Sequence, residues 1–218
     1  NKYLYSDSIN NYLQLLYPQK YINKKIPIDE YKLFSTLDYN VKLRRKYDVS
    51  VLIPYYNTNS NIFVRCIYSI LNQNNLDNLN LEILIIDDGS RKVNTIIRND
   101  ILISNHIKNK NIEINIYELK ENLGVSYALN VGLKIAKYDL ICRIDSDDIM
   151  HPDRIAYQCN KYYDMKESIL GSHFIEFNNN YDIIKSDLRP GIKSLNSLIN
   201  DIYKDNKLWY CCHSTVFF

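Results

Sequence analysis

The sequence lacks most of the features that mark non-globular and membrane proteins. Only 5 glycines and 5 prolines occur in 218 residues, which excludes a collagen-like or low-complexity chain. No apolar run approaches the roughly 20 residues that a membrane-spanning helix needs, and no secretory signal peptide is visible. The formal net charge is only +2, which gives no support to a nucleic-acid partner or a charged membrane surface. We expect a globular protein with neither.

The cysteines do not form the pattern of a metal site. They are five, an odd number. Cys211 and Cys212 are adjacent, and neighbouring cysteines rarely bond to each other for geometric reasons. We therefore expect free thiols in a cytoplasmic or otherwise reducing compartment.

What is present suffices for one substantial core. Hydrophobic residues make up 46% of the chain and charged residues 24%, which is ordinary for a globular protein. The chain begins with Asn1 rather than Met and ends on the apolar stretch 215–218. We therefore expect a piece of a longer protein.

Strand-like and helix-like patterns alternate four times in about 100 residues. This alternation predicts an α/β fold with a mostly parallel sheet and right-handed crossovers. Residues 1–47 are predicted to form a helical extension and residues 48–150 the α/β part. Residues 151–218 are predicted to form a mixed α+β part with further helices near 155–163 and 195–202 and strands near 168–177 and 213–218. Pro54 is expected to stop the first strand. The predicted strands of the central part cover residues 48–53, 81–86, 111–117 and 139–144, and the helices cover 62–71, 93–101 and 125–136.

Two of these strands end in paired carboxylates, Asp87-Asp88 and Asp147-Asp148. Because ligands of open α/β sheets bind outside the carboxyl ends of the strands, both pairs should face one cleft. Asp145, Asp147 and Asp148 would repel one another without a cation between them. Hard oxygen ligands suit Mg²⁺ or Mn²⁺ better than zinc. The alternative is a capped helix N-terminus, with Pro152 in the first turn.

The motifs together resemble those of the family 2 glycosyltransferases, which have the GT-A fold, a Rossmann-like, mostly parallel sheet flanked by helices. The resemblance covers about residues 48–218, and residues 1–47 lie outside it. Each segment alone is weak, but their order and spacing are specific. The matching segments are Val49–Asn57, Ile85–Ser90, Asn122–Ser126 with Ala128–Gly132, Asp145–Asp148 with Pro152–Arg154, and, more weakly, His213–Val216.

The resemblance implies a nucleoside diphosphate sugar held over the first strands. In this family arrangement, Asp88 would accept a hydrogen bond from uracil N3–H. Asp87 would either accept the same bond or stabilise the turn that leads into Gly89. Gly124 would permit close backbone approach to the donor, although a plain turn glycine fits the sequence as well. The nucleotide-sugar-binding residues implied are Pro54, Tyr55, Tyr56, Asn57, Asp87, Asp88, Asn122, Gly124, Asn130, Arg143, Asp145 and Ser146.

The segment Asp145-Ser146-Asp147 resembles the family's DxD signature. The metal ligands are drawn from Asp145, Asp147 and Asp148, and Asp147 is common to both plausible pairs. Arg143 would either form a buried salt bridge with an acid or approach a sugar hydroxyl. His213 would lie on the acceptor side.

The predicted function is a metal-dependent, inverting transfer from a UDP-sugar to a hydroxyl of a glycan or glycoprotein, with Mn²⁺ or Mg²⁺ as cofactor. The resemblance implies that the general base lies in an acidic pair after the histidine segment, which is expected beyond Phe218. One alternative is a non-catalytic sugar-nucleotide-binding or scaffold module. A nucleotidyltransferase is a weaker one, because it would want a Gly-rich, basic phosphate loop, and the segment 54–60 has no Gly, Lys or Arg. The sugar, the acceptor and the oligomeric state stay open.

Overall fold

The computed structural model describes residues 41–99, 111–164, 168–172, 174–177, 183–187, 192–194 and 213–218. The helices predicted before residue 41 and near residues 195–202 lie outside these ranges. The chain divides into two compact units, Asn1–Asn40 with Ile175–Leu188 and Val41–Phe174 with Arg189–Phe218. No helix in the described ranges is both long and apolar enough to cross a membrane.

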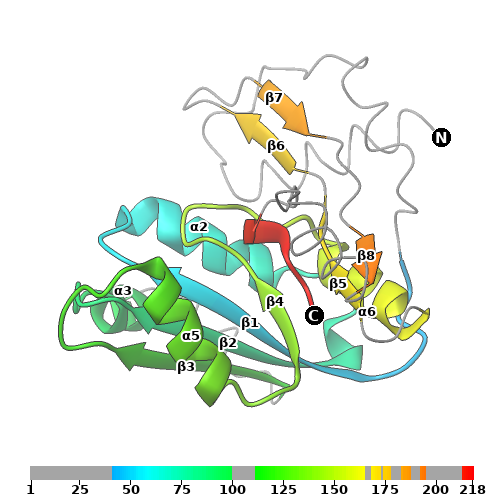
Figure 1. Cartoon of the computed structure of the whole chain (residues 1–218), viewed down its shortest axis with the longest axis horizontal. Coiled ribbons are helices and arrows are strands. Elements are labelled where there is room, and N and C mark those ends of the chain that lie inside the picture. The colour runs from blue at the N-terminus through cyan, green and yellow to red at the C-terminus, as the bar shows by residue number, and fades with distance from the viewer. Residues whose placement is uncertain are drawn as a thin grey trace, which may run out of the picture. The chain divides into compact units, whose positions relative to one another are not determined.

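The larger unit is built on a four-stranded parallel sheet with the order β3-β2-β1-β4, as Figure 1 shows. Because all four strands run in the same direction, the chain must cross over between consecutive strands. Each of these three crossovers contains a helix. This arrangement confirms the predicted α/β fold. The elements are β1 (Tyr47–Tyr55), α2 (Ser60–Leu71), η2 (Leu76–Asn78), β2 (Leu79–Asp87), α3 (Val93–Asn99), β3 (Ile112–Glu118), α5 (Val125–Ile135) and β4 (Leu140–Arg143).

The first strand runs further than the sequence predicted. It continues through Pro54, which pairs with Ile86 of β2, and ends at Tyr55. On its other side β1 pairs with β4 only as far as Leu52. Pro54 therefore lies beyond the last pair on that side, where a missing N–H interrupts no ladder. The extra residues carry Tyr55 to the level of Asp87, its partner in the register.

The sheet is covered on both faces, because its strands alternate apolar side chains between two cores. One core joins Val51 and Ile53 to α2 and α6, and the other joins Leu52 and Ile86 to α5. In α5 only Ala128 and Gly132 are buried. A Cβ atom added at Gly132 would lie 2.2 Å from Cδ1 of Leu52. The small residues thus let α5 lie close to the sheet.

The remaining elements follow the acid-rich end of β4. The segment at the C-terminus runs antiparallel to β4, and Phe217 bridges Cys142 on one side and Leu170 on the other. The single strand predicted over 168–177 was wrong, because this segment forms two separate strands. Between them the backbone N–H of Ser172 donates to the side-chain Oγ1 atom of Thr215, so it does not take part in strand pairing. These elements are α6 (Arg154–Asp164), β5 (Ser168–Leu170), β6 (Phe174–Phe177), β7 (Ile183–Asp187), β8 (Ile192–Ser194) and η3 (His213–Thr215), with β5 paired to β8 and β6 to β7.

Candidate nucleotide-sugar site

The two carboxylates at the end of β2 have different roles. Asp87 is fully buried, and its Oδ1 atom accepts hydrogen bonds from the Ser90 backbone N–H at 2.8 Å and from the Ser90 hydroxyl. Its Oδ2 atom accepts from the backbone N–H of Lys92 at 3.1 Å. Both oxygens therefore stabilise the turn after β2, which is one of the two roles predicted for Asp87.

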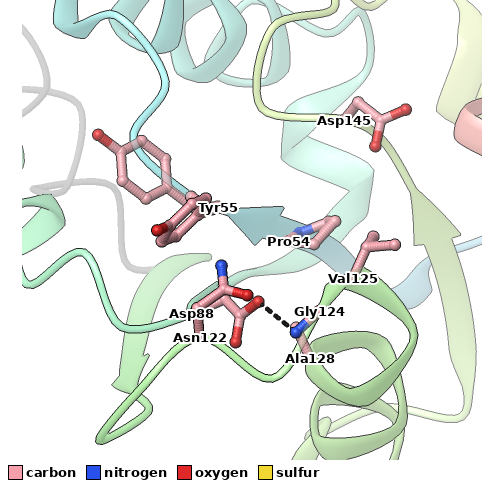
Figure 2. A pocket seen from close by; sticks show the side chains of 9 residues that line it. Pro54, Tyr55, Asp88, Asn122, Gly124, Val125, Ala128 and Asp145 are labelled. Atoms are coloured by element: carbon pink, nitrogen blue, oxygen red, sulfur yellow. Dashed lines mark hydrogen bonds between the residues drawn. The ribbon is translucent and has the colours of Figure 1, made fainter.

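Asp88 instead joins β2 to the start of α5. Its Oδ1 atom accepts from the Leu123 backbone N–H and its Oδ2 atom from that of Gly124, both at 2.8 Å. Its side chain lines a pocket, as Figure 2 shows, although the residue is only 3% exposed. A carboxylate oxygen has two lone pairs, so both oxygens keep acceptor capacity after these bonds. Asp88 is thus a buried acceptor beside an open space.

Two glycines shape the wall around Asp88. Gly89 has φ +85°, and a Cβ atom there would lie 2.5 Å from the carbonyl carbon of Glu121. Gly124 has φ +89° at the N-cap of α5, and a Cβ atom there would meet nothing within 4 Å. Such φ values strongly favour glycine. Gly89 therefore lets the loop after β2 contact the backbone at Glu121. Gly124 instead gives the backbone a positive φ where it borders the pocket.

The pocket has a volume of about 220 Å³ and lies at the carboxyl ends of the central strands. It brings together seven of the predicted binding residues from four separate segments of the chain. Figure 2 shows Asp145 across the pocket from Asp88. The lining residues are Pro54, Tyr55, Tyr56, Asp88, Asn122, Gly124, Val125, Ala128 and Asp145.

Other predicted residues lie outside this lining. Asn57, with φ +50°, and Asn130 on α5 are exposed. Asp87 serves the turn, and the buried Ser146 bonds to the loop after β1 through a 2.6 Å contact with Oγ1 of Thr58. Val125 and Ala128 also line the pocket, although they were not among the predicted binding residues. Their position in the first turn of the helix that follows Gly124 could have identified them as pocket residues.

The two tyrosines after Pro54 differ in what they offer a ligand. Tyr55 is buried against Phe63, with ring centroids 4.7 Å apart, and its hydroxyl donates to the Thr58 carbonyl at 3.0 Å. Burial, together with the charge of Asp87, raises the pKa of Tyr55. Tyr56 is 52% exposed. Its ring is therefore the one with a free face against which a base could stack.

After β4 the chain makes a tight turn that carries the three acids. The backbone N–H of Asp148 donates to the Asp145 carbonyl at 3.2 Å. The buried Arg143 guanidinium forms a two-bond ion pair with Asp145, one bond measuring 3.0 Å. Of the two roles predicted for Arg143, the structure shows the salt bridge. Asp147 is exposed and Asp148 is half-buried.

The carboxyl group of Asp148 has a raised pKa. Burial raises the pKa of its carboxyl group, and the negative charges of Asp145 and Asp147 raise it further. A hydrogen bond with Ser214 and the Arg143 charge oppose this rise in pKa. Ser214 follows His213 in η3, so the histidine segment reaches the acidic turn, although the His213 side chain lies outside the described residues. The excess of negative charge favours a cation here.

The acids do not form a complete metal cage by themselves. In the described ranges, no group of three or more His, Cys, Asp or Glu side chains is arranged to hold a metal ion. A hard cation such as Mg²⁺ is commonly held by one or two carboxylates, with phosphate and water completing its shell. Since Asp145 is engaged by Arg143, Asp147 and Asp148 are the carboxylates that could hold such a cation.

The family model for glycosyl transferase family 2 matches residues 50–218. The chain belongs to this family. The parallel sheet with helices on both faces is the GT-A fold that the resemblance implied.

Relatives of known name are glycosyltransferases. A chondroitin synthase of Pasteurella multocida is 33% identical over 136 residues, which are 62% of this chain and 13% of that protein. A hyaluronan synthase of Pasteurella multocida is 33% identical over 134 residues, 62% of this chain and 12% of that one. An uncharacterized glycosyltransferase of Haemophilus influenzae is 31% identical over 133 residues, 61% of this chain and 46% of its own length. The chain thus spans less than half the length of each.

Two solved structures illustrate the structural likeness. The mannosyltransferase PcManGT from Pyrobaculum calidifontis, in complex with GDP-Man and Mn²⁺, has a TM-score of 0.48 at 18% identity, covering 70% of this chain and 43% of that one. TarS 1–349 of S. aureus, in complex with UDP-GlcNAc, has a TM-score of 0.48 at 19% identity, covering 72% of this chain and 47% of that one.

Proposed function

We propose that this chain binds the donor in a metal-dependent, inverting glycosyltransferase that uses a UDP-sugar. The observation that carries the proposal is the placement of Asp88, a buried carboxylate on the pocket wall that two backbone N–H groups hold in place. Family membership supplies the reaction class.

The chemistry of Asp88 favours uracil over cytosine. A carboxylate accepts hydrogen bonds and donates none when ionised. Uracil offers a donor at N3, whereas cytosine offers an acceptor there, which would leave two acceptors facing each other in a buried place. A site built around such a bond discriminates sharply, because the wrong base leaves a desolvated group unpaired. The exposed ring of Tyr56 would stack on the same base.

The metal would be Mn²⁺ or Mg²⁺, held by Asp147 and Asp148. When bound, such an ion neutralises the diphosphate that leaves as the glycosidic bond forms. Arg143 keeps Asp145 fixed beside them and compensates its charge. Without a cation the turn should repel a diphosphate, so donor binding should require the metal.

The acceptor would be a hydroxyl group of a glycan or glycoprotein that attacks the anomeric carbon as the diphosphate leaves, with inversion. The names of the two Pasteurella relatives favour a polysaccharide. We assign no catalytic base to a described residue. The three cysteines in the described ranges, Cys66, Cys142 and Cys159, are free and buried, and the reducing compartment stays a prediction.

A thermal-shift series tests the proposal, since a ligand that binds the native state raises the midpoint of unfolding. UDP should raise the midpoint with Mn²⁺ present and fail to do so in EDTA. Equal shifts in EDTA would remove the metal from the proposal, and no shift with Mn²⁺ would reject the donor site.

Two further assays separate the alternatives. Release of UDP from a UDP-sugar, with an acceptor glycan present, identifies a transferase. Binding without any release supports the non-catalytic module. Pyrophosphate formed from UTP and a sugar phosphate supports the nucleotidyltransferase. The assays need the full-length protein, because the chain spans less than half the length of each of the three relatives named above.

A further inference from the structure

Helix α2 carries a buried polar stripe that the donor site does not use directly. Cys66 and Ser69 are 0% exposed and Gln73, just past the end of the helix, is 4% exposed. Their spacing of three and four residues places them on one side of the helix. Polar groups buried so deeply need hydrogen-bond partners. Here several of the partners are backbone groups in or next to the acidic turn after β4.

The stripe holds both ends of the acid loop, which we define as Asp145–Met150. At its start, the Cys66 thiol donates to the Asp145 carbonyl, with 3.4 Å between sulfur and oxygen. At its end, the Met150 backbone N–H donates to the Ser69 hydroxyl at 2.9 Å. Figure 1 shows this segment running past α2 between β4 and α6. Asp147 and Asp148 lie between the two attachment points.

Gln73 extends the attachment from the acid loop to the start of α6. Its Nε2 atom donates to the carbonyl oxygens of Ser69 at 3.0 Å and His151 at 2.8 Å. Its Oε1 atom accepts from the Ile155 backbone N–H at 3.2 Å. One buried amide therefore connects α2, the residue that follows the acid loop and the first turn of α6.

The acid loop needs such support because of its composition. It contains three carboxylates and no helix or strand. Neighbouring negative charges repel, so the carboxylates would separate unless the backbone between them were fixed. The ion pair with Arg143 holds the Asp145 side chain, and hydrogen bonds with Thr58 and Ser214 hold those of Ser146 and Asp148. The spacing of Asp147 and Asp148 depends in addition on where the loop backbone is held.

We propose that Ser69 and Gln73 are positioning residues for the metal site. They hold the backbone on the far side of Asp147 and Asp148 and so keep these carboxylates ready for one cation. The inference rests on the proposed function, since it presumes that the acid loop binds Mn²⁺ or Mg²⁺. It adds that α2, whose preceding loop carries Tyr56, also orders the metal ligands.

The test compares Ser69→Ala with Ile70→Val in the whole chain. Ser69→Ala removes the acceptor of the Met150 N–H, whereas Ile70→Val removes one buried methylene from the apolar side of the same helix. The apparent dissociation constant for Mn²⁺ is measured from the Mn²⁺ dependence of UDP binding. Removing groups that support metal ligands typically weakens metal affinity 10–100-fold, so we expect a loss of about tenfold for Ser69→Ala. Ile70→Val should leave the constant unchanged, although it also destabilises the fold.

A second readout needs no metal. In EDTA, amide hydrogen exchange of residues 145–155 should be faster in Ser69→Ala than in Ile70→Val at the same global stability. Gln73→Met, which keeps the bulk but removes three hydrogen bonds, should speed exchange at Ile155 and weaken Mn²⁺ binding too. It also serves as the test variant if Ser69→Ala fails to fold.

The outcomes separate this inference from the proposed function. If the wild type binds UDP with Mn²⁺ and Ser69→Ala and Gln73→Met keep the wild-type constant, the positioning role is wrong and the function stands. If the wild type shows no Mn²⁺-dependent binding, the function itself fails. A loss of Mn²⁺ affinity in Ile70→Val equal to that in Ser69→Ala would reduce the stripe to a general stabiliser of the fold.

Discussion

The Oδ2 atom of Asp88 accepts a hydrogen bond from the Gly124 backbone N–H at 2.8 Å, and this contact joins the end of β2 to the first residue before α5. The partner bond from Leu123 has the same length. Asp88 therefore has a structural task besides any contact with a ligand. Any substitution of Asp88 will loosen the loop before α5 as well as change what faces the base.

This double role decides how base recognition must be measured. UDP should bind at least tenfold more tightly than CDP in the presence of Mn²⁺, a difference of about 1.4 kcal/mol. Asp88→Ala should lower the affinity for both nucleotides, because the loop loses two tethers, and should also remove most of the preference. The diagnostic quantity is therefore the ratio of the two dissociation constants from paired titrations.

Asp87→Ala is the matched control for base choice. Asp87 accepts from Ser90 and Lys92 within the turn. Its loss should weaken the binding of both nucleotides while preserving their ratio. A wild type that binds UDP and CDP equally would show that Asp88 does not read the base.

The two glycines with positive φ provide a second prediction. Gly89→Ala and Gly124→Ala both place a side chain at φ near +85° to +89°, so both should lose about 1–3 kcal/mol of unfolding free energy from backbone strain. Gly89→Ala should lose clearly more, because its Cβ would also clash with the backbone of Glu121 at 2.5 Å. Urea unfolding of the two variants measures the difference. Equal losses would mean that the loop at Glu121 moves aside freely.

Much of the fold was predictable because the two inner strands of the sheet, β1 and β2, are buried on both faces. Runs such as 81–86 are nearly all apolar, and that pattern is typical of parallel sheets. The carboxylates that end β2 and β4 could be assigned to one edge as soon as the strands were taken as parallel. The structure places Asp88 and Asp145 around one pocket.

The individual partners of these carboxylates were not predictable. The local sequence around Asp87 and Asp88 is the same Asp-Asp-Gly-Ser segment, yet one carboxylate turns back onto Ser90 and the other reaches Leu123, 35 residues away. Such a choice depends on contacts between segments that are distant in sequence. The same holds for Gln73, whose role became visible only with the acid loop beside it.

Glu82 is another residue whose role came only from the structure, and it yields a third prediction. It is 2% exposed in the middle of β2, where its carboxylate accepts from the Ser50 hydroxyl, from Asn115 Nδ2 at 2.8 Å and from the Lys137 backbone N–H at 2.8 Å. Glu82→Ala should lower the free energy of unfolding by about 3 kcal/mol, because three donors lose a charged acceptor inside the fold.

Glu113 is the matched control for Glu82, since the two residues are partners in the β2–β3 register. The Glu113 side chain is half exposed and pairs with Lys137 Nζ at 2.5 Å. Exposed ion pairs contribute little, so Glu113→Ala should leave the unfolding free energy almost unchanged. Chemical denaturation of both variants is the measurement, and a similar loss in both would contradict the proposed importance of the buried network.

The last prediction concerns the pH dependence of stability that Asp148 creates. Burial, and then the charges of Asp145 and Asp147, raise the pKa of its carboxyl group above the ordinary value of 3.8. The folded chain therefore holds this proton more tightly than the unfolded chain does. The contribution of Asp148 to stability is fully present at low pH. It should be lost as the pH rises from about 3.8 through the raised pKa, and stay lost above it.

Asp148→Asn isolates this effect, because the amide cannot titrate. In EDTA, the unfolding free energy of the variant minus that of the wild type should increase as the pH rises through this window and then level off. With saturating Mn²⁺ and UDP the trend should reverse, because metal binding requires the ionised carboxylate and stabilises only the wild type strongly. Urea unfolding at a series of pH values, with and without metal, measures both arms. A difference that stays constant with pH in EDTA would show that Asp148 titrates normally. A missing reversal would show that Asp148 does not bind the metal.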